Sequence, residues 1–270
     1  MHTRFLLAFL LPIAFFACKQ DPNANTATAA PSANADMLGG QWIAIDFCAR
    51  AGQYGSVLQA ESNAHRPYAL ALVFNPAEPD SVQCFNGPVS WKLPVQIRKD
   101  TVELPGVKGK SIFLVYDSQG EKNLIMFDGI SGKSTQMDKF IKSKANAQDG
   151  HRAFMTALNH NLFNGTFSPL AAKGAGEKVM FTPGGFVQGW KEFDRYEICI
   201  SSDCWVMGNE MDMVTLYNSK KKDAGQSFGF KYSNQNDTLS FLQLADATPD
   251  EKGGYAVKGT AYKLLRKQLQ

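Results

Sequence analysis

The sequence predicts a mainly antiparallel all-β protein, arranged as two tandem β units with a short helix between them. Three observations predict this class. From residue 40 onward, short runs alternate between apolar and polar residues, with the period of two typical of half-buried strands. Turn-forming residues separate these runs, as in a sandwich or a closed barrel. One amphipathic helical pattern near the middle of the chain divides the runs into two groups.

The expected strands are short and are separated by regular turns. Trp91, Leu93 and Val95 alternate on one face of one run, and Pro94 limits that run to a sheet edge or a bulge. The expected strands cover residues 68–74, 91–97, 111–116, 123–127, 178–182, 186–190, 195–200, 211–217, 227–232, 238–244 and 260–265.

Two helices are expected among these strands. The segment 49–61 has apolar residues on one side, although Gly52 and Gly55 weaken its helical pattern. The segment 149–162 has a clearer apolar stripe and begins with Asp149 as the expected N-cap. We interpret this second helix as the connector between the two β units.

The composition is that of a globular protein and excludes some classes of function. Of the 270 residues, 44% are hydrophobic and 20% are charged, so the chain can bury a core. The 28 Lys and Arg residues nearly balance the 25 Asp and Glu residues and are scattered along the chain. Because a nucleic-acid-binding domain usually carries a basic stripe, we expect no nucleic-acid partner.

The first 17 residues, MHTRFLLAFLLPIAFFA, predict an export signal. Arg4 gives the segment a positive start, and an apolar run continues as far as Ala17. This run is too short to cross a hydrocarbon core of about 30 Å as a helix, and Pro12 interrupts it. Cys18 follows directly.

The junction at Cys18 resembles the signal of bacterial lipoproteins, in which the cysteine becomes the lipid-modified first residue of the mature chain. Ala17 fits that pattern, whereas Phe15 replaces the more usual Leu, and this relaxed form followed by Lys19 resembles lipoproteins of the Bacteroidota. The resemblance implies a cell-envelope protein anchored in outer-membrane lipid, facing the periplasm or the cell surface. An ordinary secretory signal with a coincidental cysteine is the alternative.

The segment after the signal predicts a disordered tether. It reads KQDPNANTATAAPSANAD and has no large apolar residue that could build a core. The expected divisions are a signal peptide at 1–17, the tether at 18–36, a first β unit with one short helix at 37–145, the connector helix at 146–163 and a second β unit at 164–270.

Four cysteines remain besides Cys18, an even number that suits an oxidising compartment. Three pairings are possible, and we expect Cys199–Cys204 and Cys48–Cys84. A two-residue turn between Cys199 and Cys204 would place them opposite each other in a hairpin, within disulfide reach. No C-x2-C spacing is present, so neither a zinc site nor a redox motif is expected.

The two β units open and close alike. Gly40-Gln41-Trp42 opens the first and Gly165-Thr166-Phe167 the second, and each unit ends in an aromatic and basic segment. These segments resemble lipocalin-like β-barrels, and the second unit resembles the repeated lipocalin-like domains of Bacteroidota lipoproteins. The resemblance implies two tandem barrels in which Lys142 covers Trp42 and Arg266 covers Phe167. One continuous sheet is the alternative.

Aromatic side chains alternate along the strands expected in the second unit. Core filling is the first interpretation of these side chains, and the wall of a small apolar cavity is the second. In the second interpretation the ligand-binding residues are Trp190, Tyr196, Phe228, Phe230 and Tyr232.

The sequence offers no catalytic, metal-binding or cofactor-binding motif. Residues 129–134 imitate a phosphate-binding loop, but Phe127 stands where that loop needs a glycine. His151 and His160 lie on opposite sides of the expected connector helix and cannot share a ligand. No G-x-S-x-G motif is present. We therefore expect neither an enzyme nor a bound cofactor.

Two functions remain as hypotheses. The first is a non-catalytic cell-envelope lipoprotein that binds a small apolar or amphiphilic ligand inside a β-barrel. The alternative is a protein-interaction or hydrolase-inhibitor module of the envelope, whose barrel is filled by side chains. Bulky interior residues favour the alternative, and small interior residues beneath an aromatic mouth favour the first hypothesis.

Overall fold

The computed structural model describes residues 35–105, 111–117, 121–129, 135–144, 149–173, 175–200, 211–221, 225–233, 235–246 and 255–267. These residues belong to one compact unit. They form two separate antiparallel sheets, each nearly closed into a barrel, so the predicted class of two tandem barrels is confirmed and one continuous sheet is excluded. No helix in these ranges is long and apolar enough to cross a membrane.

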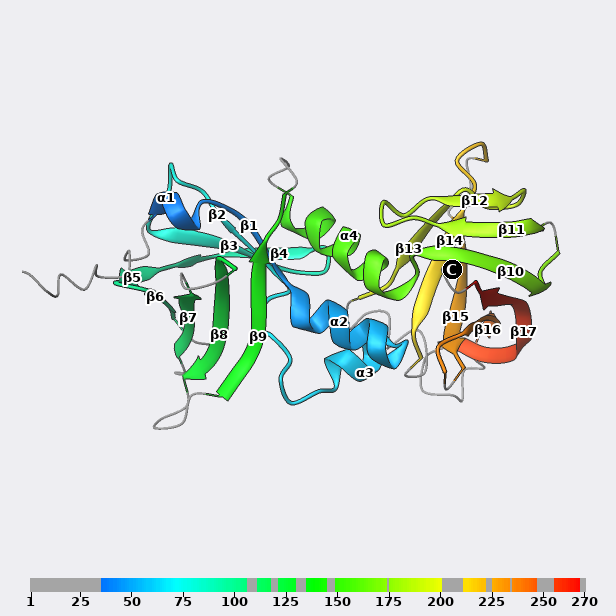
Figure 1. The fold of residues 1–270 in the computed structure, drawn as a ribbon, viewed down its shortest axis with the longest axis horizontal. Coiled ribbons are helices and arrows are strands. Elements are labelled where there is room, and N and C mark those ends of the chain that lie inside the picture. Colours follow the sequence, from blue (N-terminus) through cyan, green and yellow to red (C-terminus); the bar gives the residue numbers. More distant parts are fainter. Residues whose placement is uncertain are drawn as a thin grey trace, which may run out of the picture. The chain divides into compact units, whose positions relative to one another are not determined.

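The first sheet has nine strands in the order β4-β3-β2-β1-β9-β8-β7-β6-β5 (Figure 1). Its first strand pairs with its last along the chain, because β1 lies between β2 and β9. The strands are β1 (Gly40–Ala44), β2 (Ala71–Phe74), β3 (Ser81–Asn86), β4 (Val89–Pro94), β5 (Gln96–Arg98), β6 (Thr101–Leu104), β7 (Ser111–Asp117), β8 (Asn123–Gly129) and β9 (Thr135–Lys142).

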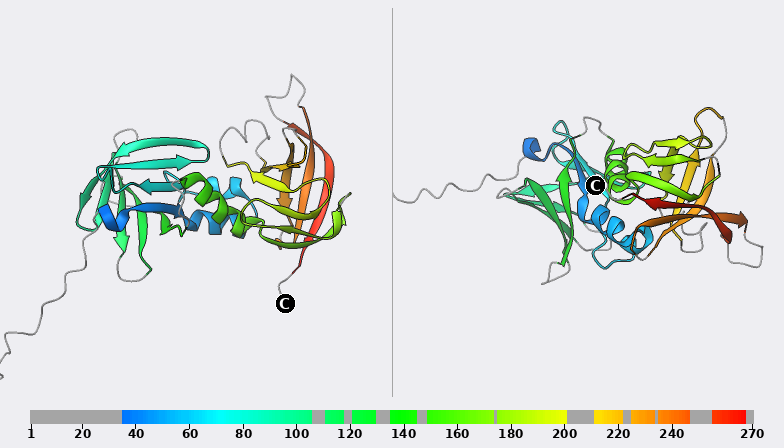
Figure 2. Two further views of the ribbon diagram at one scale, coloured as in Figure 1. Left: turned by 90° about the horizontal axis from the view of Figure 1, so that it is seen from above. Right: turned by 45° about the vertical axis from the view of Figure 1, so that its right-hand side comes forward.

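The second sheet has eight strands in the order β12-β11-β10-β17-β16-β15-β14-β13. It curves strongly (Figure 2), and its two outermost strands meet where the amide of Val187 donates to the carbonyl oxygen of Asp194 over 2.9 Å. The strands are β10 (Gly165–Ala171), β11 (Ala175–Phe181), β12 (Val187–Trp190), β13 (Arg195–Ile198), β14 (Met213–Tyr217), β15 (Gln226–Tyr232), β16 (Thr238–Asp246) and β17 (Tyr255–Arg266).

Four helices lie within the described residues: α1 (Ala35–Leu38), α2 (Ile45–Tyr54), α3 (Val57–Glu61) and α4 (Gly150–Leu162). The expected connector helix is α4, and its N-cap is Asp149, whose carboxylate accepts from the amide of Arg152 over 3.0 Å. Figure 1 shows α4 beside α2, and Phe154 of α4 packs on Phe47 of α2 with ring centroids 5.8 Å apart.

The single helix expected at 49–61 is instead two helices, because the chain turns at Gly55. That residue has a φ of 62°, in the left-handed region that favours glycine. A Cβ at this position would lie 2.7 Å from Oδ1 of Asn236, so the turn also allows a close approach to the second sheet. Ser56 then caps α3 by accepting from the amide of Gln59.

The strand patterns are mostly correct, with two differences. The run expected at 91–97 is divided, because β4 ends at Pro94 and β5 begins at Gln96; both are edge strands of the first sheet. The strands β3 and β6 were not predicted. Only the end of β9 was expected, as the segment that closes the first unit with Lys142 over Trp42. Because Asp138 of β9 is buried, the period-two pattern of this strand contains a polar residue where an apolar one is expected.

The predicted Cys48–Cys84 disulfide is wrong, since both cysteines are free and buried. Cys48 lies on α2, which contacts α3, α4 and β9, whereas Cys84 lies on β3 opposite Leu72 and Trp91. The expectation rested on the even number of cysteines, which left these two to pair once Cys199 and Cys204 were paired. Cys199 is disulfide-bonded, but Cys204 lies outside the described residues, so the Cys199–Cys204 pairing stays a prediction.

The two buried thiols are expected to resist alkylation in the folded protein. Burial raises the pKa of Cys48 well above its ordinary value, and burial raises the pKa of Cys84 to about 12, so the reactive thiolate is scarce. Iodoacetamide at pH 8, without a reductant, should leave both thiols unmodified in buffer and should alkylate both in urea. Rapid modification of the native protein, measured by mass spectrometry of its peptides, would contradict this expectation.

Candidate ligand-binding site

The five predicted ligand-binding aromatics belong to the core of the second barrel. Four of them, Trp190, Tyr196, Phe228 and Phe230, are at most 5% exposed. Trp190 packs edge-on against Tyr262 with ring centroids 4.8 Å apart. Such side chains fill the interior of an eight-stranded barrel and leave no room for a ligand among them.

Phe163, directly after α4, completes this aromatic core. It is fully buried and contacts the rings of five residues, with centroid separations of 5.0 to 6.3 Å. The rings that it contacts belong to Phe181, Tyr196, Phe230, Tyr232 and Phe241. The hydroxyl groups of this set donate to the backbone, Tyr196 to Thr182 and Tyr232 to Leu162, over 2.7 Å each.

The structure brings together both aromatic and basic pairs that the sequence singled out. Trp42 lies opposite Lys142 in the register of β1 and β9, and the Lys142 ammonium is 5.7 Å from the Trp42 ring centroid. Phe167 lies opposite Arg266, whose guanidinium is 5.3 Å from the Phe167 ring centroid. Both cations therefore sit over the aromatic residue of the first strand, where cation–π attraction holds them.

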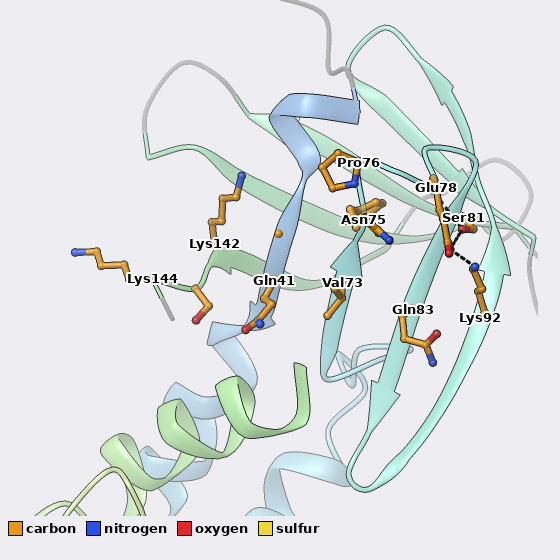
Figure 3. Close-up of a pocket in the computed structure, with 13 residues that line it drawn as sticks. Gln41, Val73, Asn75, Pro76, Glu78, Ser81, Gln83, Lys92, Lys142 and Lys144 are labelled. Atoms are coloured by element: carbon orange, nitrogen blue, oxygen red, sulfur yellow. Dashed lines mark hydrogen bonds and ion pairs between the residues drawn. The ribbon is translucent and has the colours of Figure 1, made fainter. Parts of the chain in front are cut away.

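A candidate site lies on the outer face of the first barrel, beside β1. Gln41, Val73, Gln83 and Lys92 are successive cross-strand neighbours on β1 to β4, so they share one face of the sheet (Figure 3). They line a hollow of about 560 Å³, which we call the polar lobe. Its remaining lining residues are Gly40, Phe74, Asn75, Pro76, Glu78, Ser81, Lys142, Ser143 and Lys144.

The far end of the polar lobe carries a fixed charge pair. Glu78 and Lys92 form an ion pair, and the ammonium of Lys92 keeps the pKa of Glu78 below its ordinary value. The hydroxyl of Ser81 also donates to the carbonyl oxygen of Glu78 over 3.3 Å. This end of the lobe is therefore rich in groups that hydrogen-bond a polar ligand.

A second hollow, of about 790 Å³, lies between β1, β9 and α4, and we call it the apolar lobe. Ile43 and Ile141 are direct cross-strand neighbours within it, and α4 contributes Ala153 and Ala157. Small residues on α4 leave the space between helix and sheet unfilled. The other lining residues are Gln41, Ile45, Lys142, Ser143, Lys144, Arg152, Thr156, His160, Asn161 and Pro183.

The two lobes share Gln41, Lys142, Ser143 and Lys144, so they adjoin along β1 and the end of β9; together we call them the Gln41 groove. Gln41 is 5% exposed, and its side-chain oxygen has no hydrogen-bond partner within the described residues. Such an atom is usually satisfied by water or a ligand. No Asp or Glu lines the apolar lobe, whereas Lys144 and Arg152 do, so this lobe attracts negative charge.

No protein-family model, curated protein or solved structure matches this chain. The candidate site therefore depends on its geometry alone. The sequence reasoning did not predict that Ile43 and Ile141 line a binding site, although the sequence contained a pattern that indicates it. In Trp42-Ile43 and Phe140-Ile141, apolar residues occupy both faces of a strand, which indicates that something covers the outer face as well as the inner one. In the structure, α4 lies against the outer face of β1, where Ile43 points away from the buried Trp42.

A buried ion pair holds α2 against β9, outside the groove. The Arg50 guanidinium lies 2.9 Å from the Asp138 carboxylate, whose side chain is fully buried. Asp138 also accepts from the amide of Asp46 over 3.1 Å. Burial outweighs these contacts and raises the pKa of Asp138 to about 7. Burial likewise raises the pKa of Glu61, the partner of Arg66, to about 7.

These raised pKa values predict that stability falls as the pH rises. A carboxyl group whose folded pKa exceeds its unfolded value binds protons more tightly in the folded state. The contribution of such a carboxyl group to the free energy of unfolding is complete below about pH 4 and is lost as the pH rises through about 7. We expect the free energy of unfolding in urea to decrease from pH 5 to pH 8, and to decrease less in Asp138→Asn. An equal slope in the variant would contradict this assignment.

Proposed function

We propose that this protein is a non-catalytic cell-envelope lipoprotein, anchored through Cys18, that binds a small anionic amphiphile in the Gln41 groove. The observation that supports the proposal is the adjacency of the apolar lobe and the polar lobe, which share four lining residues. An amphiphile has an apolar tail and a polar head, so its site needs an apolar lobe beside a polar one. The binding site is thus moved from the barrel interior, which Phe163 and its neighbours fill, to the outer face.

The apolar lobe fits the tail of such a ligand. Its volume of about 790 Å³ lies within the range of small-molecule sites. Ile43, Ile141 and Ala157 would bury the hydrocarbon, and burial of each methylene group contributes about 0.8 kcal/mol. A tail of ten to twelve carbons would therefore supply most of the affinity.

The polar residues fit the head of the ligand. Lys144 and Arg152 line the apolar lobe and form no ion pair among the described residues. A negatively charged head would gain from both cations, whereas a positively charged head would be repelled. The unpartnered oxygen of Gln41 marks the shared wall, where the head would enter the polar lobe.

The test compares two amphiphiles of equal tail length. We expect the protein without residues 1–18 to bind dodecanoate in isothermal titration calorimetry, and dodecyltrimethylammonium at least roughly tenfold more weakly. Ala157→Phe should fill the apolar lobe and weaken dodecanoate binding by roughly tenfold or more. The control Ala171→Phe places the same ring on an exposed residue outside the groove and should leave binding unchanged.

A second candidate function is a protein-interaction or hydrolase-inhibitor module of the envelope. The filled interior of the second barrel favours it, because bulky inward residues leave no space for a ligand there. If dodecanoate does not bind, or if it binds Ala157→Phe as tightly as the original protein, the amphiphile proposal fails. The interaction module then becomes the better account.

A further inference from the structure

A second polar pocket, of about 620 Å³, lies between one side of α4 and the strands β13 and β14. Three of the four α4 residues that line it, His151, Met155 and Asn159, are spaced four apart and so lie on one side of the helix. We call it the Asn159 pocket. Across from α4 it is lined by Gly184, Gly185, Arg195, Tyr196, Glu197, Tyr217, Asn218, Ser219 and Lys221, and at the start of the helix by Asp149 and Arg152.

The α4 side of this pocket contains two polar atoms without partners. Asn159 is 5% exposed; its amide nitrogen donates to the carbonyl oxygen of Pro183 over 3.0 Å, but its side-chain oxygen has no partner among the described residues. Nδ1 of His151 is also buried without a partner there. Buried polar atoms are nearly always satisfied, so this wall is suited to a ligand that both donates and accepts hydrogen bonds.

The rim of the pocket carries three cations, and two carboxylates, Asp149 and Glu197, also line the pocket. Arg152, Arg195 and Lys221 form no ion pair within the described residues. The guanidinium of Arg195 lies 5.1 Å from the Phe186 ring centroid, which holds it in place. Asp194, next to Arg195, accepts instead from the amide of Ser219 over 2.8 Å.

We propose that the Asn159 pocket binds a sugar acid, a hydroxylated ring that carries one carboxylate. The carboxylate would pair with the rim cations, since guanidinium and ammonium groups bind carboxylates strongly. The hydroxyl groups can donate to the free oxygen of Asn159 and to Glu197, and can accept from His151. A neutral sugar would leave the cations unpaired, and a simple carboxylate would leave the oxygen of Asn159 unpaired. This inference does not rest on the proposed function, although Arg152 lines both the Gln41 groove and the Asn159 pocket.

The experiment titrates three small molecules into the protein and follows its backbone amide signals by NMR. We expect D-glucuronate to bind, and D-glucose and propionate each to bind at least roughly tenfold more weakly. Arg152→Gln and Lys221→Gln should each weaken glucuronate binding by roughly fivefold. Arg98→Gln, an exposed arginine of β5 outside the pocket, is the matched control and should change nothing.

Four results would overturn the proposal. Absence of glucuronate binding would exclude the site. Equal binding of glucose would show that the cations are not used, and equal binding of propionate would show that the hydroxyl groups are not recognised. Equal losses in Arg152→Gln and Arg98→Gln would indicate general charge attraction. Because the substituted residues are exposed, the variants should fold, and their amide spectra show whether they do.

Discussion

Replacing Phe163 by alanine is expected to lower the free energy of unfolding by about 3 to 5 kcal/mol. The side chain is fully buried, and its ring contacts five other aromatic rings of the second barrel. Removing the ring leaves a cavity whose walls are stiff aromatic side chains on hydrogen-bonded strands. Such walls collapse poorly, so the loss should lie at the upper end of the usual range.

Urea unfolding monitored by tryptophan fluorescence measures this loss. Phe186→Ala is the matched control, because Phe186 is 47% exposed and its change should be about 1 kcal/mol or less. The cavity should also let a small apolar molecule such as benzene bind inside the second barrel, whose interior is filled by side chains in the original protein. A loss no larger than that of the control would show that Phe163 does not fill the barrel.

The second large effect is expected from Arg50→Met. At pH 8 the Asp138 carboxylate would be ionised, fully buried and without its guanidinium partner. Breaking a buried pair in this way costs about 3 to 5 kcal/mol. At pH 5 the loss should be smaller, because Asp138, with a pKa of about 7, can take up a proton and become neutral.

The double variant Arg50→Met/Asp138→Asn separates charge from packing. It removes the guanidinium and the carboxylate charge together, so it should recover much of the stability that Arg50→Met loses at pH 8. Urea unfolding of both variants and the original protein at pH 5 and pH 8 provides the comparison. If Arg50→Met is equally destabilised at both pH values, the buried charge of Asp138 is not the cause.

The period-two pattern in the sequence was sufficient to predict the fold class. Strand and turn signals are local, so they located most strands and the capped helix α4. The pairing of Trp42 with Lys142 and of Phe167 with Arg266 could also be predicted from the sequence. The reason is that the first and last strands of each unit pair with each other in a barrel.

The thiols and the aromatics show where local signals were insufficient. Cys48 and Cys84 were paired on the expectation of an exported chain with an even number of cysteines, but Cys48 lies on the helix α2 and Cys84 on the strand β3, and both are free. Trp190 and Phe228 fitted a ligand cavity as well as a core. The tertiary structure shows that the interior is filled, with Phe163, the residue directly after α4, packed among these rings.

The sequence by itself determined the alternation of strands, the two-unit division and the capped connector, because each depends on residues that are neighbours along the chain. The tertiary structure alone decided where a ligand can bind. The Gln41 groove and the Asn159 pocket each combine one face of α4 with strands far away in the sequence. A cavity is what packing leaves unfilled, so it depends on the distances between elements, which no local pattern specifies.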